Sequence, residues 1–300
     1  MLRVTDLRKR FGDVCAVDGL SLEVRRGEVF GLLGPNGAGK STTIAMCIGL
    51  IHPDSGTVEL QGLGDPRDPA VRAHLGLAPQ SLAIYDDLSA EENMVFFGQL
   101  HGVPDPRGRA LTLLERVGLA PRRQDRVKGF SGGMKRRLNI ACGVLHRPQL
   151  ILLDEPTVGV DPQSRQRIWE MLGKLRDEGA SLLLTTHQLD EAQQLCERIV
   201  IIDHGKSIAS GTVAELIAST IGVRHEIALR LDAPPPPELA VTGLRVDDRS
   251  LVGRIDNVAG ELAPLLARIA ASGRVVEDVQ LASPTLHSVF IALTGRELRE

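Results

Sequence analysis

The chain has 300 residues, 43% hydrophobic and 24% charged, which is typical of a soluble globular protein with one large domain or two ordinary ones. A formal net charge of −3 and an aromatic content of 3% give no reason to expect nucleic-acid binding, which relies on basic surfaces and stacking rings. The four cysteines are widely spaced without a CxxC pair, so we expect reduced thiols and no cysteine metal site. Neither a signal peptide nor a membrane-spanning segment is expected, because the chain opens on strand-like sequence and its apolar runs are short.

The first elements in chain order are short strands. Residues 2–8 and 20–25 have strand patterns, and a third apolar strand is predicted at Glu28–Leu33. Phe11 lies between the first two strands. Its ring could stack on a nucleotide base, although sequence alone slightly favours a place for Phe11 in the core.

The nine residues after the third strand contain the eight-residue pattern G-x-x-x-x-G-K-[ST] of a phosphate-binding loop, with Thr42 directly after it. They are Gly34, Pro35, Asn36, Gly37, Ala38, Gly39, Lys40, Ser41 and Thr42. Glycines allow successive N–H groups to point into one hollow, and the N-terminus of the following helix favours an anion. Lys40 can reach the β- and γ-phosphates, and Ser41 carries the hydroxyl that such loops place on Mg²⁺. A strand before and a helix after the loop favour nucleoside triphosphate binding over an ordinary glycine-rich turn.

The following stretch is mixed in character. A turn at 53–56, a strand at 57–61 and a strand at 74–78 lead to Gln80, which alone would be an ordinary loop glutamine. Residues 81–128 look helical and polar, with breaks near 102–106 and 118–121.

A Ser-Gly-Gly turn, Ser131-Gly132-Gly133, opens a helix that is predicted to run to about residue 145. Its free amides make it either a second anion site or an ordinary helix cap, and sequence alone does not decide between them. Lys135–Arg137 is most simply interpreted as a solvated face of that helix.

Two adjacent acids follow an uninterrupted apolar strand at Gln149–Leu153. Such a strand indicates a buried parallel sheet, and ligands of these sheets bind at the carboxyl ends of the strands. Asp154 and Glu155 can therefore have different roles, in which one holds Mg²⁺ and the other orients the attacking water. The alternative is a cap for the next helix, but the phosphate loop favours the catalytic interpretation.

A turn at 159–162 and a helix at 163–178 lead to another apolar strand at 181–186. His187 directly follows this strand. A lone histidine is more often structural. Here it lies at a carboxyl end, where the γ-phosphate is expected. A helix at 189–197, a hairpin at 198–209 and a helix at 213–219 complete this region.

The sequence changes character beyond about Gly222. Strands, a hairpin and two helices are predicted, and together they give a small α+β unit without a cluster of chemically active side chains. The expected strands lie at 225–231, 244–246, 251–255 and 274–281, and the helices at 259–271 and 284–293. The prolines at 234–237 are interpreted as a loop between strands and not as a partner-binding motif.

Over about residues 2–219 the order of these motifs resembles the ATP-binding cassette (ABC) family of transporter ATPases. The resemblance implies an α/β fold, a P-loop NTPase cassette with a mostly parallel core sheet, an antiparallel N-terminal subdomain and a helical subdomain at about 81–145. The ATP-binding domain would cover residues 1–220, and a small α+β accessory domain residues 221–300. The C-terminal segment and the sequence of Thr157–Arg165 are similar to those of the bacterial drug- and polysaccharide-export branch of the family.

The resemblance also implies roles for individual residues. Phe11 would stack on adenine with Val17 near the base, the loop would hold the phosphates, and His187 would contact the γ-phosphate. Ser41 and Gln80 would meet Mg²⁺, Asp154 would support it through water, and Glu155 would be the general base. The segment that reaches the ATP of the other protomer would be Ser131, Gly132, Gly133 and Met134, with Asp161 at the same interface. Phe130 and Met134 depart from the usual Leu-Ser-Gly-Gly-Gln.

With one cassette in the chain, the resemblance implies ATP and Mg²⁺ as cofactors, a second ATPase protomer in a homodimer, and an integral membrane permease. No nucleic-acid partner is expected. The chain would lie at the cytoplasmic face of the plasma membrane, with residues 81–100 passing motion to the permease. Two alternatives stay open, an importer ATPase and a non-transport cassette protein acting on ribosomes or DNA, and the tail favours export.

Overall fold

The computed structural model describes residues 1–236, 239 and 244–295 and divides into two compact units. The first unit spans Met1–Thr212, and the second begins at Val213. The division falls ahead of the domain boundary expected at residue 220, because helix α8 (Val213–Thr220) packs against helix α10 (Leu286–Thr294).

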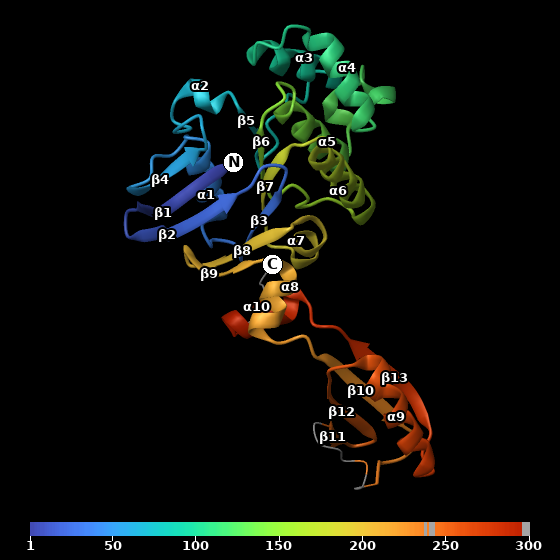
Figure 1. The fold of residues 1–300 in the computed structure, drawn as a ribbon. Coiled ribbons are helices and arrows are strands. Elements are labelled where there is room, and N and C mark those ends of the chain that lie inside the picture. The colour runs from blue at the N-terminus through green and yellow to red at the C-terminus, as the bar shows by residue number, and fades with distance from the viewer. Residues whose placement is uncertain (237–238, 240–243, 296–300) are drawn as a thin grey trace. The chain divides into compact units, whose positions relative to one another are not determined.

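A six-stranded sheet forms the centre of the first unit, in the order β5-β6-β7-β3-β8-β9 (Figure 1). Its strands are β3 (Val29–Leu33), β5 (Leu75–Ala78), β6 (Leu150–Asp154), β7 (Ser181–Thr186), β8 (Arg198–Asp203) and β9 (Lys206–Gly211). All neighbours pair in parallel except β8 and β9. Every residue of β3, β6 and β7 is buried, as their continuous apolar sequences predict. The predicted mostly parallel core sheet is confirmed.

A smaller antiparallel sheet has the order β2-β1-β4. Its strands are β1 (Leu2–Phe11), β2 (Val14–Val24) and β4 (Ser55–Leu60). Side chains of this sheet, of helix α1 (Lys40–Cys47) and of the central sheet share one hydrophobic core, in which Leu2, Val17 and Ile44 meet Leu152. This core fixes the phosphate loop between the two sheets.

Helices make up the rest of the first unit. They are α2 (Pro69–Arg72), α3 (Ala90–Leu100), α4 (Pro106–Arg116), α5 (Gly132–Gly143), α6 (Pro162–Asp177) and α7 (Leu189–Leu195), with short 3₁₀ turns at Ala120–Arg122 and Val127–Gly129. Helices α3, α4 and α5 pack on one another as the expected helical subdomain (Figure 1). Ser89 and Glu92 form a capping box that fixes where α3 begins.

The second unit has a four-stranded antiparallel sheet in the order β11-β12-β10-β13. Its elements are β10 (His225–Leu231), β11 (Leu244–Asp247), β12 (Ser250–Ile255), α9 (Val258–Ala271) and β13 (Val276–Ala282), besides α8 and α10. Leu229 and Leu251 of the sheet share a core with Leu265 and Ile269 of α9. The α+β prediction is confirmed, whereas the expected proline connector is described only as far as residue 236, its last residue lying outside the described part of the chain. No helix in the described part of the chain is both long and apolar enough to cross a bilayer.

Candidate functional site

The phosphate loop joins the end of β3 to the start of α1 and depends on glycine at two close approaches. Gly39 has φ 100°, in the left-handed region, and a Cβ there would lie 2.2 Å from the Ala16 carbonyl oxygen. A Cβ on Gly34 would lie 2.4 Å from the Ile202 carbonyl oxygen. Side chains at these positions would push the loop out of its curled shape.

Lys40 is 5% exposed and folds back over the loop. Its Nζ donates hydrogen bonds to the carbonyl oxygens of Gly34 at 2.8 Å and Pro35 at 3.1 Å. It also lies 3.1 Å from Glu155 Oε1 in a buried ion pair. The loop lysine is therefore held beside the acid that the sequence singled out.

Asp154 and Glu155 follow the carboxyl end of β6, and Thr185 of β7 holds both. Thr185 Oγ1 donates to Asp154 Oδ1 at 2.6 Å, and the Glu155 N–H donates to the same hydroxyl at 3.0 Å. Glu155 has φ 47°, which is uncommon for a residue with a Cβ. Its side chain thereby turns away from that of Asp154 and reaches a different set of partners.

Three of the residues predicted from sequence converge on the Glu155 carboxylate. Besides Lys40, the Gln80 amide donates to Oε2 at 3.3 Å, and His187 Nδ1 lies 3.2 Å from Oε1. The histidine contact has the distance of an ion pair but not the angle of a hydrogen bond, so Nδ1 has no hydrogen-bond partner among the described residues. Burial by itself would raise the pKa of Glu155, but His187 and Lys40 outweigh it and hold the pKa below its ordinary value. Glu155 is thus ionised at neutral pH.

Phe11 and Val17, both expected near a base, differ in exposure. Phe11 ends β1 with 48% of its surface exposed, and Lys9 Nζ lies 5.5 Å from its ring centroid. The core placement that sequence slightly favoured for Phe11 is wrong, because the residue ends β1 beside the turn to β2, where it pairs with Val14. Val17 is 1% exposed and packs beside Gly39, so its contact with a base stays a prediction.

The Ser-Gly-Gly turn begins α5 and lies against the start of α6. Ser131 Oγ accepts a hydrogen bond from the Met134 N–H at 3.3 Å. A Cβ on Gly133 would lie 2.3 Å from the Ser164 side chain, so glycine lets the two helices meet. Asp161 caps α6 by accepting the Ser164 N–H at 2.9 Å, which lowers the pKa of Asp161. The turn and Asp161 thus form one cluster, in which Ser131, Gly132 and Asp161 are exposed.

This cluster and the phosphate loop are built on different elements. Helix α5 packs against α3, α4, α6 and β5, whereas α1 packs against β2, β6 and β7. The predicted residues therefore fall into two groups, one around Glu155 and one at the starts of α5 and α6.

Known proteins match the chain along its whole length. The family described as "ABC transporter" matches residues 17–158. The linearmycin resistance ATP-binding protein LnrL of Bacillus subtilis is 38% identical, with 100% of both chains covered. A Nod factor export ATP-binding protein I of Cupriavidus metallidurans is 41% identical over 100% of this chain and 99% of its own. The chain belongs to the ABC transporter ATP-binding family.

Solved cassettes agree with this assignment. The structure described as an ATP-binding subunit of an ABC transporter has a TM-score of 0.66 and 31% identity, covering 73% of this chain and 92% of its own. This chain is therefore the ATP-binding subunit of an ABC transporter, an ATPase whose activity is coupled to transport.

A further expectation for the cassette is wrong. Lys135–Arg137 is not a solvated helix face, because Arg136 and Arg137 are each 5% exposed and Lys135 pairs with Asp86 at 2.8 Å. Arg136 donates to the carbonyl oxygens of Pro79 at 2.9 Å and Gln80 at 2.8 Å. These carbonyls compensate the buried charge, and they tie the helix that begins at Ser131 to the Gln80 loop.

Sequence reasoning missed Thr185, Arg136 and Glu191 of the cassette. Each acts through a partner distant in sequence, so no local pattern marks it. A weak signal exists for Arg136, since three consecutive basic residues point about 100° apart on a helix and cannot all share one face. Glu191 is 1% exposed, and a buried acid is rare unless it is paired or hydrogen-bonded.

Proposed function

We propose that this chain is the ATP-hydrolysing subunit of an exporter and that it works as one half of a dimer bound to a membrane permease. The observation that carries the catalytic part is the convergence of Lys40, Gln80 and His187 on the Glu155 carboxylate. An ionised, buried carboxylate beside the phosphate loop suits a general base.

In this proposal Glu155 accepts a proton from the water that attacks the γ-phosphate. When ATP binds, the ion pair of Lys40 with Glu155 breaks and Lys40 pairs with the phosphates instead. Its Nζ lies between the phosphate loop and Glu155 and can contact either one. His187 then faces the γ-phosphate and Phe11 stacks on the adenine. Gly34–Thr42 supply backbone N–H groups to the phosphates.

We further propose that Mg²⁺ accompanies the nucleotide. Ser41, Gln80 and Asp154 offer hydroxyl, amide and carboxylate oxygens, the donor types that Mg²⁺ prefers. Thr185 holds one oxygen of Asp154 and so fixes the direction of the other, which suits a carboxylate acting through a water shell. Bound Mg²⁺ would neutralise charge on the phosphates.

The second protomer is inferred from the separate cluster at Ser131–Met134 and Asp161. We propose that this cluster covers the ATP held by the phosphate loop of the other protomer, most simply a second copy of this chain. Free amides at the start of α5 suit a phosphate, and the exposed Asp161 suits an interface. Two ATP molecules would then be enclosed between protomers.

Export is favoured over import by the relatives. LnrL and the Nod factor protein carry names of resistance and export, and both match this chain through its second unit as well as its cassette. We propose a peripheral location at the cytoplasmic face of the plasma membrane, through the permease. The second unit would regulate the dimer or support it.

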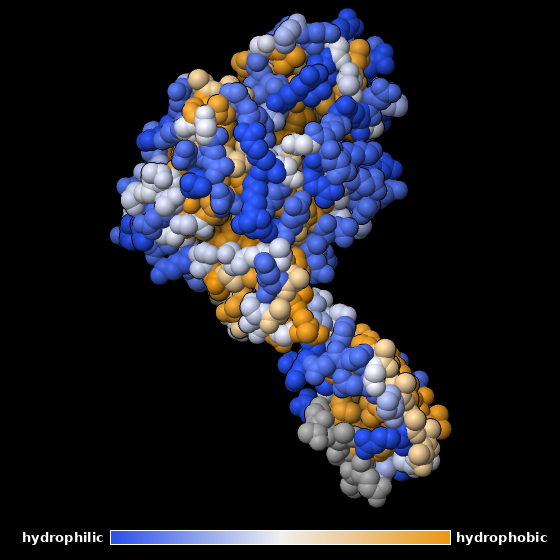
Figure 2. Space-filling model, in the orientation of Figure 1, coloured by the Kyte–Doolittle hydropathy of each residue, from blue (hydrophilic) through white to orange (hydrophobic). Residues whose placement is uncertain are grey.

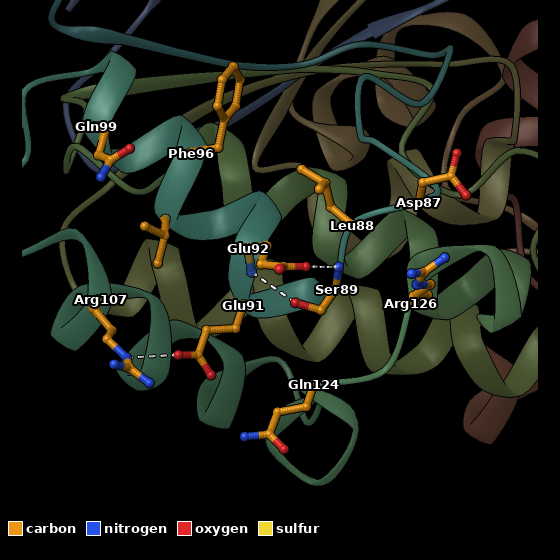
Figure 3. Close-up of a pocket in the computed structure, with 11 residues that line it drawn as sticks. Asp87, Leu88, Ser89, Glu91, Glu92, Phe96, Gln99, Arg107, Gln124 and Arg126 are labelled. Atoms are coloured by element: carbon orange, nitrogen blue, oxygen red, sulfur yellow. Dashed lines mark hydrogen bonds and ion pairs between the residues drawn. The ribbon is translucent and has the colours of Figure 1, made fainter.

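The permease contact is proposed at residues 81–100. A cavity of about 800 Å³ lies beside the start of α3 and has Leu88, Val95 and Phe96 on its apolar wall (Figure 3). The capping box of Ser89 and Glu92 and the ion pair of Glu91 with Arg107 at 2.9 Å line its polar side.

Apolar residues are also exposed around this cavity. Figure 2 shows hydrophobic surface over α3, where Phe96 and Leu100 are 40% and 69% exposed. Tyr85, in the loop before α3, is 51% exposed. Asn93 of α3 accepts the Tyr85 N–H at 2.8 Å and is fully buried, so motion of the Gln80 loop would reach this surface.

Two experiments test the proposal. Glu155→Gln should retain ATP binding and lose turnover, and undiminished hydrolysis would remove Glu155 from the role of base. Affinity purification of the tagged chain from mild detergent should bring down a membrane protein with several apolar spans. Recovery of a substrate-binding protein with that complex would instead support an importer, and recovery of ribosomes would contradict transport.

A further inference from the structure

Glu191 lies in the first turn of α7, and the residue is 1% exposed. Its Oε1 accepts hydrogen bonds from Thr157 Oγ1 at 2.8 Å and from Trp169 Nε1 at 3.2 Å. The Thr186 side chain is a further hydrogen-bond partner. Three donors from three different segments therefore meet one buried carboxylate.

Each of these segments carries a residue of the proposed site. Thr157 follows Glu155 by two positions and is fully buried. Thr186 directly precedes His187. Trp169 belongs to α6, the helix that Asp161 caps. Glu191 thus connects the base, the histidine and the proposed dimer interface, although it touches none of them.

A buried carboxylate is costly unless its oxygens are satisfied, and burial raises the pKa of Glu191. Apolar side chains could fill the same space without that cost. Hydrogen bonds differ from apolar packing because they fix distances and directions between their partners. An acid here is therefore better suited to setting the geometry of three segments than to adding stability.

We propose that Glu191 is a positioning residue for ATP hydrolysis, which holds the segments of Glu155, His187 and Asp161 in register through Thr157, Thr186 and Trp169. The inference rests on the roles proposed above for those three residues. Because of this connection, a shift of Asp161 on contact with a partner protomer would change the positions of Glu155 and His187 together.

The first test is Glu191→Gln, which keeps the size of the side chain but replaces one acceptor oxygen by a donor. We expect kcat to fall about tenfold or more while KM for ATP changes less than about threefold, because the phosphate loop is untouched. Glu170→Gln is the matched control, since Glu170 is exposed on α6 next to Trp169. Equal kcat in Glu191→Gln and the control overturns the proposal.

A second pair of variants keeps the test valid if Glu191→Gln folds poorly. Thr157→Val removes the hydroxyl at nearly constant volume, and Thr157→Ser retains it. We expect a several-fold loss of kcat in the valine variant and recovery in the serine variant, with similar melting temperatures. Loss of activity in both variants, or in neither, contradicts a role for this hydrogen bond.

The third readout is spectroscopic, because Trp169 is the single tryptophan of the chain and donates to Glu191. Its emission maximum should shift in Glu191→Gln, where the carboxyl acceptor of the indole N–H is replaced by an amide, and not in Glu170→Gln. A loss of kcat without a shift of this emission overturns the proposed route. A Glu155→Gln variant that still hydrolyses ATP would contradict the proposed function instead, so the two failures are distinguishable.

Discussion

Lys40 Nζ lies 3.1 Å from Glu155 Oε1, and both side chains are almost fully buried. The lysine that would bind phosphates and the acid that would activate water are therefore partners of each other. ATP must compete with Glu155 for Lys40. One ion pair therefore links the binding of ATP to the activation of the base.

This competition predicts that Glu155→Gln binds a non-hydrolysable ATP analogue more tightly than the native chain. A neutral amide holds Lys40 less strongly than a carboxylate does, so the expected gain is about 1 kcal/mol, roughly fivefold in Kd. Equilibrium titration of both proteins measures it. Weaker binding by the variant would show that the ion pair does not oppose the nucleotide.

The lowered pKa of Glu155 predicts an effect of pH on stability. A carboxyl whose pKa is depressed in the folded chain contributes stability above its ordinary value of 4.5, and the contribution is lost as pH falls through the folded pKa. Lys40→Met removes one cause of the depression, so it should lower the melting temperature at neutral pH. The difference from the native chain should shrink in acid. Equal differences at both pH values would contradict this origin.

Gly39→Ala should abolish ATP binding, because the added Cβ would lie 2.2 Å from the Ala16 carbonyl oxygen at a left-handed φ. Gly12→Ala is the matched control, since Gly12 also has a positive φ but nothing within 4 Å of an added Cβ. We expect the control to cost about 1 kcal/mol of stability and to bind ATP normally. A loss of binding in both variants would point to general strain instead.

Arg136→Lys should lower both stability and kcat. Lysine cannot reproduce the two guanidinium bonds to the carbonyls of Pro79 and Gln80, and the expected cost is about 1–3 kcal/mol of unfolding free energy. Arg176→Lys, at a half-buried site on α6 where the arginine pairs with its neighbour Asp177, should leave both quantities unchanged. Denaturant titration and phosphate release check the two effects, and a fully active Arg136→Lys would argue against a role in holding the Gln80 loop.

Phe96→Ser should reduce copurification of the membrane subunit while the isolated chain keeps its ATPase activity. The ring is 40% exposed and lines the cavity beside α3, so its loss removes apolar surface without opening the core. Leu111→Ser on α4 is the control, at 39% exposure outside that cavity. Retention of the partner by Phe96→Ser and its loss from Leu111→Ser would place the contact elsewhere.

The fold and the first half of the site could be predicted because their signals are local. The loop at Gly34–Thr42 and the pair Asp154-Glu155 each occupy a few consecutive residues with a strand before them, and the predicted mostly parallel core sheet is confirmed. Thr185, Arg136 and Glu191 could not be found in this way. Their importance comes from partners about 30 to 60 positions away in the chain, and only folding brings them together.

The exposure of charged side chains was equally beyond local patterns. Lys135–Arg137 has the composition of a solvated face, yet Arg136 and Arg137 are buried because loop carbonyls on neighbouring elements accept their hydrogen bonds. The prediction for Phe11 was wrong in the opposite direction, since a core position was slightly favoured but the ring is exposed where β1 ends beside the turn to β2.

Phosphate release by Glu155→Gln, measured beside the Glu170→Gln control at saturating ATP and Mg²⁺, tests the central claim most directly. We expect the variant to bind ATP but to release phosphate at least about a hundredfold more slowly than the control, because it lacks a general base. Release at the rate of the control would contradict the assignment of Glu155 as the base.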